Sequence, residues 1–512
     1  MNTSTSGDHK SAFLSAQIPN IQVGSSSDVD SPGSSIFDLP VHQEDTPTLE
    51  SRPRHFLSAS QLSTAGVVPG VQNASKTNPS FLVISGGTGC NSICSAFGDA
   101  CYVLPVSDDG GSSSEIIRVL GGPSIGDIRS RLIRLIPASP QGSPLDRIRN
   151  LLAYRLNADS TEREARDEWH DIVEGRSSLW LGIPLDRKEV IRGFLVSFES
   201  EVLRRAQKNF SFRNGSVGNY FLAAARIFFR SLPSAIFLFS SITNSQANIV
   251  PALVTNHTVT IAAELESGRN LVGQCNISHP VQSDTSFSFS LALTPPVGDE
   301  GESGTSPVER SQTRNLVFSK DVEGRVEPLD SRISRLFYIN AYGHEIHPSP
   351  NPDFLSQCAS EGVLVYSCGS LWTSIMPCLA LKGVASAIAR SQTLKAKILL
   401  LNAKNDRETG GYTAADYIKH PNAHLDDSAI AHTLNTHYES QSTYTSFPIS
   451  AFVTHLVHLS GGLVPLDVQQ ITAMGVQCIE VASRSSPGDE RGPMFDAECV
   501  KDALRVIFGE GL

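Results

Sequence analysis

Four short apolar runs constrain the fold of this chain more than any other feature of its sequence. Each run ends in a polar loop, and most of these loops are rich in glycine. Apolar runs of this length that end in polar loops are typical of strands that are buried on both faces of a parallel sheet. The four runs are Phe81–Ser85, Tyr102–Val106, Val363–Tyr366 and Ile398–Leu401.

Helical periodicity separates these runs. Ile128, Leu132, Leu135 and Ile136 fall on one face of a predicted helix. A longer apolar stripe, at spacings of three and four residues, consists of Val190, Ile191, Phe194, Leu195, Phe198, Val202 and Leu203. Strands that alternate with helices predict an α/β protein, with a mostly parallel sheet covered by helices on both faces.

Composition divides the chain further. Residues 1–79 mix Ser, Pro, Asp and Thr with isolated apolar residues, and such a segment cannot bury enough apolar surface to offset its ordering entropy. They predict a disordered N-terminal tail, and residues 80–512 are expected to form a single α/β domain. Within that domain we interpret residues 137–213 as a helical insertion and residues 281–330 as a partly disordered loop.

Charge and hydropathy exclude several classes of protein. The net charge of −11 and the pI near 5.7 argue against a nucleic-acid-binding protein, which usually has a basic face. No apolar run approaches the ~20 residues that span a bilayer, and Met1–Asn20 lacks the charged start and apolar core of a signal peptide. Nine cysteines without a C-x-x-C pair indicate reduced thiols. We therefore expect a cytoplasmic protein with no nucleic-acid or membrane partner.

The loop after the first run is Gly86-Gly87-Thr88-Gly89. In open α/β sheets ligands lie beyond the carboxyl ends of the strands, and glycines let backbone N–H groups approach an anion there. The loop matches neither the dinucleotide pattern G-x-G-x-x-G nor the lysine-bearing phosphate loop, and we expect neither flavin nor NAD as a cofactor. It predicts a phosphate site, with a tight strand–helix turn as the structural alternative.

Asp108 and Asp109 stand side by side after the second run. Adjacent carboxylates repel each other unless a cation, a hydrogen-bond donor or water compensates. At a strand end they can hold Mg²⁺, bind a ligand hydroxyl or act as a base, so both are candidate catalytic residues and either is a candidate metal ligand. A helix N-cap plus a solvated charge is the alternative for the pair. The sequence does not distinguish which carboxylate faces the ligand.

Further polar positions lie at the starts of predicted helices and at the ends of predicted strands. Asp127 can cap the Ile128–Ile136 helix, while Arg129 projects from its first turn as a phosphate clamp. Ordinary caps, a surface arginine or plain turns would give the same patterns. The candidate nucleotide-binding residues of this kind are Gly126, Asp127, Arg129, Asn219, Gly369, Ser370, Thr373, Ser374 and Asn402.

Six motifs in a fixed order resemble those of the 2-phospho-L-lactate transferase superfamily, which includes the UPF0052 proteins. Within that superfamily, the sequences of the motifs are most similar to those of the bacterial gluconeogenesis-factor branch. The match extends from Phe81 to about Tyr417 and is interrupted by residues 137–213 and 280–330. The motifs are FLVISGGTG, VLPVSDDGGSSS, GDIRSRL, SVGNYFLAA, YSCGSLWTSIMPCL and LLLNAKNDRETGGYTAADYI.

This resemblance implies a Rossmann-like core with a nucleotide cleft. The family's transferases move 2-phospholactate from a guanosine diphosphate ester to a deazaflavin precursor with Mg²⁺ and release GMP. Its other branch is known for binding UDP-sugars and for regulating carbon metabolism. Carried over, Gly86–Gly89 line the phosphate site, and Asp108 or Asp109 faces the acceptor or the metal. Cys368 and Ser130-Arg131 depart from the family wording beside the motifs.

Two functional hypotheses follow. The first is a nucleotide-binding transferase that moves a phospho-group-bearing acyl moiety from a nucleoside diphosphate ester and releases a nucleotide, with Mg²⁺ as cofactor. The second is a non-catalytic UDP-sugar-binding regulator of carbon metabolism, like bacterial gluconeogenesis factor. The ligand is accordingly a nucleoside diphosphate ester or a nucleotide-sugar. The insertion at 137–213 can form a cap or an oligomer surface, which suggests a homodimer.

Overall fold

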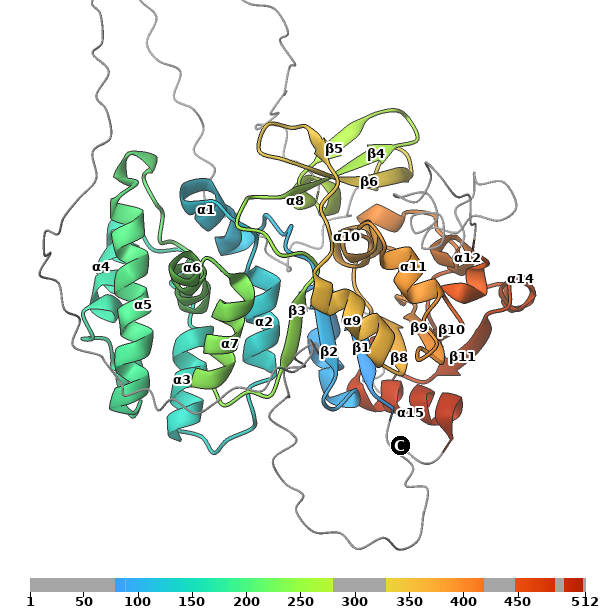
Figure 1. The fold of residues 1–512 in the computed structure, drawn as a ribbon, viewed down its shortest axis with the longest axis horizontal. Helices are drawn as coiled ribbons and strands as arrows, with labels where there is room; N and C mark the ends of the chain where they lie inside the picture. The colour runs from blue at the N-terminus through green and yellow to red at the C-terminus, as the bar shows by residue number, and fades with distance from the viewer. Residues whose placement is uncertain (1–78, 88, 280–327, 419–446, 484–491, 510–512) are drawn as a thin grey trace, which may run out of the picture. The chain divides into compact units, whose positions relative to one another are not determined.

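The computed structural model describes residues 79–87, 89–279, 328–418, 447–483 and 492–509, which all lie in the unit Ser75–Leu512 (Figure 1). Almost all of the predicted tail, Thr88 and nearly all of the 281–330 loop lie outside these residues, so those three predictions stay predictions. Among the described residues no helix is long and apolar enough to cross a membrane.

A parallel sheet forms the centre of the described residues. Its order is β11-β10-β9-β8-β1-β2-β3, and each neighbouring pair is parallel. The four predicted runs are strands β1, β2, β8 and β9, with bounds shifted by at most two residues, and every residue of these strands is buried. The strands are β1 Phe81–Ile84, β2 Cys101–Leu104, β3 Asn248–Pro251, β8 Val363–Tyr366, β9 Ala396–Leu400, β10 His455–Leu459 and β11 Gln477–Val481.

The strand order reverses beside β1. The chain runs outward from β1 to β2 and β3, returns to the other side of β1 as β8, and then runs outward again through β9, β10 and β11. In Rossmann-like sheets, ligands bind outside the carboxyl ends of the strands at such a reversal. The loops that follow β1 and β8 therefore flank the expected binding crevice.

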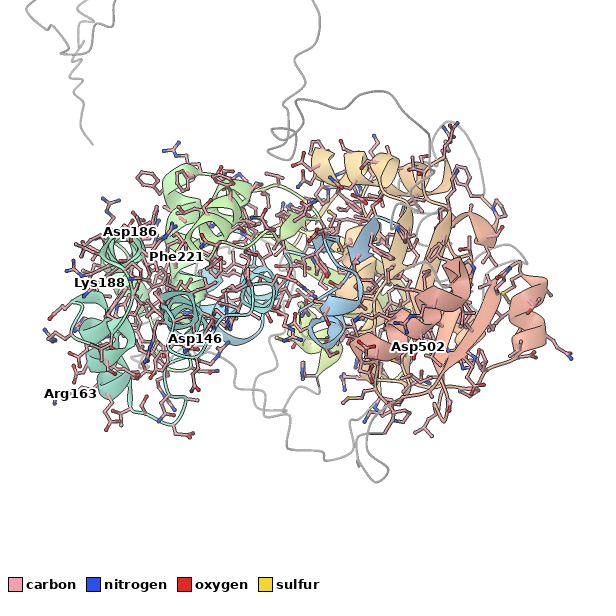
Figure 2. All side chains as sticks on the ribbon, turned by 90° about the horizontal axis from the view of Figure 1, so that it is seen from below. Asp146, Arg163, Asp186, Lys188, Phe221 and Asp502 are labelled. Atoms are coloured by element: carbon pink, nitrogen blue, oxygen red, sulfur yellow. The ribbon has the colours of Figure 1, made fainter. Side chains whose placement is uncertain are left out.

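Helices cover both faces of this sheet, which confirms the predicted fold class. Figure 2, in which Asp502 marks α15, shows that helix on one side of the strands and α9 and α11 on the other. α15 packs on β11 and on the turn Cys94–Ala96, while α9 and α11 pack on each other. These helices and their neighbours are α9 Pro352–Ser360, α10 Met376–Leu379, α11 Val384–Ala389, α12 Ala414–Ile418, α14 Val468–Ala473 and α15 Ala497–Phe508.

The chain between β2 and β3 is helical, including the predicted insertion. The long α5 confirms the predicted helix, and its buried stripe is Ile191, Leu195, Phe198 and Val202. Val190 and Leu203, which the periodicity also assigned to that stripe, are exposed because they lie on its flanks. The helices are α1 Gly111–Leu120, α2 Gly126–Arg134, α3 Pro144–Ala153, α4 Glu162–Val173, α5 Leu185–Leu203, α6 Val217–Phe229 and α7 Leu232–Ile242.

An aromatic cluster holds the insertion against α6. Trp169 of α4 stacks on Phe212 and meets Tyr220 of α6 edge-on, with ring centroids 5.2 and 5.0 Å apart. Phe198 of α5 stacks on Tyr220 at 4.4 Å, and Phe210 completes the cluster. Buried aromatic rings in offset or edge-to-face contact stabilise an interface beyond the area that they bury. The cluster therefore fixes the position of α6.

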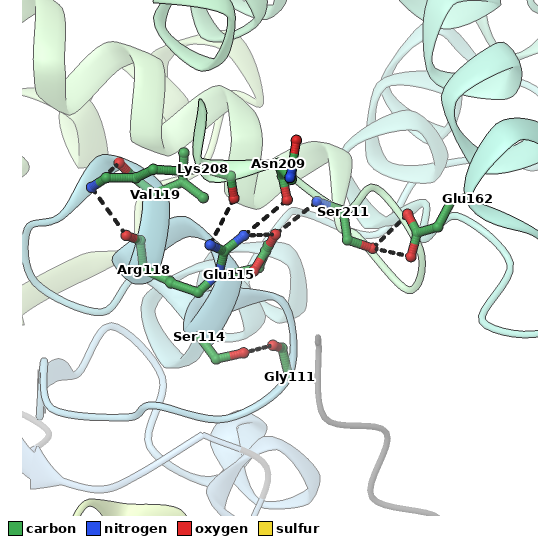
Figure 3. Close-up of polar contacts among 9 residues, drawn as sticks. All are labelled: Gly111, Ser114, Glu115, Arg118, Val119, Glu162, Lys208, Asn209 and Ser211. Carbon is green, nitrogen blue, oxygen red and sulfur yellow. Dashed lines mark hydrogen bonds and ion pairs between the residues drawn. The ribbon is translucent and has the colours of Figure 1, made fainter. Parts of the chain in front are cut away.

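A polar network joins α1 to the end of the insertion (Figure 3). Glu115 of α1 is buried and accepts hydrogen bonds from the Arg118 guanidinium and from the Ser211 backbone N–H, all at 2.7 Å. Arg118 also donates to the Lys208 and Asn209 carbonyl oxygens. A buried charge with several donors is satisfied only while all of them stay in place. The network therefore fixes the direction of α1.

Replacing Glu115 with alanine is expected to lower the free energy of unfolding by about 3 kcal/mol, because the buried Ser211 N–H and Arg118 both lose their acceptor. Glu115→Gln keeps one acceptor oxygen and is expected to cost less. The exposed Asp167, which pairs with Arg163 at 3.8 Å, is the matched control, and its alanine variant is expected to change stability by less than ~1 kcal/mol. Urea denaturation of the three variants measures this, and equal losses for Asp167→Ala and Glu115→Ala would contradict it.

A second sheet of the described residues is antiparallel, in the order β5-β4-β6-β7. The sequence patterns did not predict it. A short helix, α8 (Gln274–Ser278), follows β5 directly and contacts the turns Leu371–Ile375 and Arg407–Thr409 that follow β8 and β9. The second sheet therefore contributes one helix to the region beyond the carboxyl ends of the parallel strands. Its strands are β4 Thr260–Leu265, β5 Asn270–Val272, β6 Ile333–Ile339 and β7 Glu345–Ile346.

Candidate functional site

The glycine loop after β1 lies against two other predicted site segments. A Cβ on Gly86 would collide with the Ser374 hydroxyl, and a Cβ on Gly87 would collide with the Asp127 carboxylate. A Cβ on Gly89 would lie 2.7 Å from the Cys368 carbonyl oxygen. Glycine is required where backbones or side chains approach this closely. The loops after β1 and β8 and the start of α2 are therefore brought together where the strand order reverses.

Arg131 holds the start of the glycine loop by hydrogen bonds. Its guanidinium is fully buried and donates to the Ser85 hydroxyl at 3.1 Å, to the Gly86 carbonyl oxygen at 3.2 Å and to the Cys94 sulfur. It also lies over the Tyr102 ring, 4.9 Å from the centroid. Arg131 is one of the two positions that depart from the resembled family wording after GDIR. At this position the chain uses a buried cation to hold its glycine loop.

Asn402 and Gly369 join the ends of β9 and β8. The Gly369 N–H donates to Asn402 Oδ1 at 3.1 Å, and Asn402 Nδ2 donates to the Gly369 carbonyl oxygen at 2.7 Å. Both polar groups of the Asn402 amide thus bond to Gly369. This reciprocal pair fixes the Gly369 backbone beside the glycine loop.

Glu408 lies in the turn Arg407–Thr409, and its carboxylate bonds to the start of the helical turn Leu371–Ile375. Its buried carboxylate accepts from the backbone N–H groups of Trp372 and Thr373 at 3.0 and 3.2 Å, from the Thr373 hydroxyl at 2.6 Å and from Ser278 at 2.7 Å. Burial, and then the charge of Asp406, raise the pKa of Glu408 to about 8. Thr373, a predicted phosphate ligand, gives its N–H and its hydroxyl to this carboxylate. No role for Glu408 was predicted from the sequence, although a charged residue inside the segment ETGGY was a signal for one.

Asp108 and Asp109 differ in their surroundings. Asp109 Oδ1 accepts from the Cys275 N–H at 2.9 Å, at the start of α8. Asp108 Oδ1 accepts from the Gly110 N–H at 3.0 Å and from Gln274 Nε2 at 3.1 Å. Asp108 Oδ2 has no hydrogen bond to any residue that the structure describes, and it lies beside Gly126, where a Cβ would be 3.2 Å away. Asp109 thus anchors α8, whereas Asp108 keeps one oxygen free at the start of α2.

Asp108 and Asp127 form an acidic pair. Burial raises the pKa of Asp127 to about 6, although Arg131 lowers it. Burial, and then the charge of Asp127, raise the pKa of Asp108 well above its usual range. Burial also raises the pKa of Asp109. Neighbouring carboxylates of this kind favour a shared proton or a cation between them.

The donor set fits a divalent cation that arrives with its ligand. Within the described ranges no group of three His, Cys, Asp or Glu side chains is placed to hold a metal ion. Mg²⁺, however, is usually held by one or two carboxylates together with substrate phosphates and water, not by a complete protein cage. Asp108 and Asp127 supply that number of carboxylates.

Two helices, α1 and α2, begin beside this acidic pair, whereas the first N–H group of α6, that of Val217, donates to the Tyr154 carbonyl oxygen at 3.1 Å. α1, α2 and α6 pack against one another, and the residue before each helix makes no side-chain capping bond. The Asn219 amide of α6 donates to the Ser112 hydroxyl of α1 at 2.7 Å, and Ser113 of α1 lies beside Gly126 of α2. Uncapped helix N-termini present N–H groups and a positive dipole end to an anion. Six other described helices carry side-chain caps, from Ser143, Thr161, Ser231, Asn351, Asp467 and Asp496, whereas α5, α8, α10 and α11 also lack them.

Arg129 and Asn219 extend the site along α2 and α6. Arg129 Nε donates to Asn219 Oδ1 at 3.3 Å, and Asn219 is buried. The predicted residues thus meet in one region, with Arg129 on the α6 side and Gly86, Gly87, Gly89, Gly369 and Ser374 on the β8 side. Sequence reasoning missed Gln274, Cys275 and Ser278, because α8 follows a three-residue strand of the unpredicted sheet and carries none of the resembled motifs.

Comparisons with known proteins find similar sequences over most of the chain. The family described as 2-phospho-L-lactate transferase CofD matches residues 81–482. The uncharacterized protein YNL011C of Saccharomyces cerevisiae is 32% identical over 436 residues, which cover 78% of this chain and 95% of that protein. The putative gluconeogenesis factor of Thermotoga maritima is 20% identical over 366 residues, covering 70% of this chain and 80% of that protein.

Solved structures share the fold. A UPF0052 family member from Bacillus halodurans superposes with a TM-score of 0.51 and 18% sequence identity, covering 83% of this chain and 99% of that one. A second crystal structure of a Bacillus halodurans protein gives the same TM-score at 17% identity. At this identity the likeness concerns the fold alone, and it agrees with the seven-stranded parallel sheet.

Proposed function

The chain belongs to the 2-phospho-L-lactate transferase CofD family, and we propose that it binds a nucleoside diphosphate ester where its strand order reverses and transfers the phospho-group-bearing moiety to an acceptor. The observation that carries the proposal is that α1 and α2 both begin beside Asp108, without side-chain caps, and that the start of α2 lies against the glycine loop. Backbone N–H groups and helix dipoles there favour the negative charge of a diphosphate.

Asp108 is the residue that we assign to the acceptor. The transfer forms a bond between an acceptor oxygen and the β-phosphorus, and it breaks the bond from that phosphorus to the α-phosphate oxygen, so that a nucleoside monophosphate leaves. The acceptor hydroxyl loses a proton, which Asp108 accepts through its free Oδ2. A raised pKa makes a carboxylate a stronger base, and positioned bases contribute about 10²- to 10⁴-fold to such rates.

Asp127 and the helix N-termini serve the phosphates in this proposal. Asp127, beside Asp108, would hold Mg²⁺ together with oxygens of the diphosphate, and the ion would neutralise phosphate charge when it is bound. The N–H groups at the starts of α1 and α2 stabilise negative charge that develops on the leaving phosphate. Asp109 fixes α8, and Gln274 of that helix orients Asp108 from its other oxygen.

A nucleotide-sugar-binding regulator is the second candidate function. It is supported by the similarity to the putative gluconeogenesis factor of Thermotoga maritima, which extends over 70% of this chain. Such a regulator would use the same loops for the diphosphate of a UDP-sugar and would carry out no transfer. The two candidates differ in the product and not in the position of the bound diphosphate.

A ligand panel tests the proposal. Nucleoside diphosphates and nucleoside diphosphate esters with Mg²⁺ are expected to raise the melting temperature, since a ligand at 100 times its Kd stabilises the native state by about 2.7 kcal/mol. Adenosine and guanosine without phosphates are the matched controls and are expected to have no effect. Chromatography of the same mixtures with an acceptor measures nucleoside monophosphate release.

The outcomes separate the candidates. Release of a nucleoside monophosphate from an ester supports the transferase. Stabilisation by UDP-sugars without release from any ester supports the regulator. If no diphosphate compound changes the melting temperature, both are wrong.

A further inference from the structure

Two arginines beside α6 lack a carboxylate partner. Arg129 is on α2, and Arg155 follows α3 in the inserted segment. Burial, and then the positive charge of Arg155, lower the pKa of Arg129 to about 10. No ion pair joins either guanidinium to a carboxylate in the part of the chain that the structure describes. Two neighbouring cations without a counter-ion are unfavourable unless an anion joins them.

Several other arginines of the same helical region form ion pairs. Arg118 bonds to Glu115, Arg149 lies 3.9 Å from Asp146, and Arg176 bonds to Asp171 at 2.7 Å. Arg204 and Arg205 both bond to Glu201. Several arginines here thus have acidic partners, whereas Arg129 and Arg155, like Arg134 and Arg226, have none among the described residues.

Both side chains keep donors that could bind an oxyanion. Arg129 gives only Nε, to Asn219. Arg155 is exposed and gives only Nη1, to the Asn214 carbonyl at 2.7 Å and side chain at 3.5 Å. The remaining N–H groups have no hydrogen bond to the described residues. The guanidinium fork is suited to carboxylate and phosphate oxygens, which it can bind in pairs.

Buried hydroxyls next to Arg155 also lack partners. Ser216 pairs with Arg155 through an isolated antiparallel bridge, and its buried Oγ makes no hydrogen bond within the described ranges. The same holds for the buried hydroxyl of Tyr220, whose pKa is raised by burial and lowered in smaller part by the charge of Arg155. Glu115 and Glu162, whose charges also act on Tyr220, bond to Arg118 and Ser211 instead. Buried hydroxyls usually have hydrogen-bond partners, so the region around Arg155 has hydrogen-bonding groups to which a ligand could bind.

We propose that Arg129 and Arg155 form a second oxyanion subsite, separate from the diphosphate position and contributed in part by the inserted segment. It takes a carboxylate or phosphate carried by the moiety that is transferred or by the acceptor. Asn219 links the two places, since it bonds to Arg129 on one side and to Ser112 at the start of α1 on the other. This inference rests on the proposed function, because it treats the two subsites as halves of one ligand site.

Inorganic phosphate, measured by calorimetry, is the probe. The wild-type protein is expected to bind two phosphates, and Arg155→Ala is expected to lose one of them, with at least a 10-fold weaker Kd at that subsite. Arg155→Lys keeps the positive charge but loses the paired donors of the guanidinium. Its phosphate affinity at that subsite is expected to lie between those of the wild type and of Arg155→Ala. Arg163→Ala is the matched control, because Arg163 lies in the same segment with its side chain 91% exposed. Circular dichroism of each variant verifies the fold.

A Gly87→Val variant makes the two subsites separable, since it blocks the loop after β1. If Gly87→Val loses one phosphate and Arg155→Ala loses the other, the inference is supported. An Arg155→Ala variant that binds phosphate like the wild type overturns it, while the proposed function still stands if Gly87→Val loses a phosphate. If instead only Arg155→Ala loses a phosphate, the oxyanion subsite is supported and the diphosphate position is wrong. The same calorimetry with lactate in place of phosphate measures whether a carboxylate alone binds to the Arg129–Arg155 subsite.

Discussion

Replacing Asp108 with asparagine is expected to lower the rate of transfer by ~10²-fold or more, while the protein remains folded and still binds nucleotide. Asp108 is the carboxylate with a free oxygen beside the start of α2, and asparagine cannot accept a proton there. The amide can still accept from Gly110, so local structure is expected to persist. The rate in the wild type is expected to rise with pH through the pKa of Asp108, because only the ionised form acts as a base.

Asp109→Asn is the matched comparison. Asp109 accepts from the Cys275 N–H at the start of α8, a contact like that of a helix cap. Its loss is expected to lower the free energy of unfolding by about 0.5–2 kcal/mol, with little effect on the chemical step. Single-turnover kinetics and thermal unfolding on both variants measure this. If Asp109→Asn loses the rate and Asp108→Asn does not, the assignment is reversed; if neither does, the pair is structural.

Gly87→Val is expected to abolish nucleotide binding, with a Kd weakened beyond ~10²-fold. Any side chain at position 87 would collide with the Asp127 carboxylate, so it displaces the group proposed to serve the phosphates and fills the approach to the loop. Part of the loss is expected to return with Gly87→Ala, whose single methyl group demands a smaller shift. Isothermal calorimetry with GDP and UDP measures both.

The control for this substitution is Gly193→Val in α5. A Cβ at Gly193 meets open space, and the residue is exposed, so nucleotide affinity is expected to be unchanged. Unchanged affinity in Gly87→Val itself would exclude the loop after β1 from the binding site. Circular dichroism would identify a Gly87→Val protein that fails to fold. In that case the nucleotide affinity of Gly87→Ala is compared with that of the wild type instead.

The central strands and the site loops could be predicted from the sequence because their signals are local. β1, β2, β8 and β9 are buried on both faces and therefore read as short apolar runs. The outer strand β11 is partly exposed, so its sequence QCIEV mixes polar and apolar residues and gives no comparable signal. Motif order along the chain supplied the resemblance, and that resemblance is confirmed by the family match.

The contacts that define the site could not be predicted in the same way. The acceptor groups for Gln274 and Cys275 lie 166 residues earlier in the chain, at Asp108 and Asp109. Glu408 reaches Thr373 across 35 residues and Ser278 across 130. The contacts of Gln274, Cys275 and Ser278 depend on how the two sheets pack, and the contact of Glu408 with Thr373 depends on the pairing of β8 with β9. No local pattern encodes either. The Mg²⁺ cofactor, a homodimer and the cytoplasmic address stay predictions.

The position of β1 has a consequence for how this protein is made. β1 pairs on one side with β2, which follows it within about 20 residues, and on the other side with β8, about 280 residues later in the chain. At a synthesis rate of ~10 residues per second, the edge of β1 that pairs with β8 stays unpaired for about half a minute, until β8 has been translated. An unpaired hydrophobic edge is a template for aggregation, so we expect the nascent chain to be most prone to aggregate before β8 is translated.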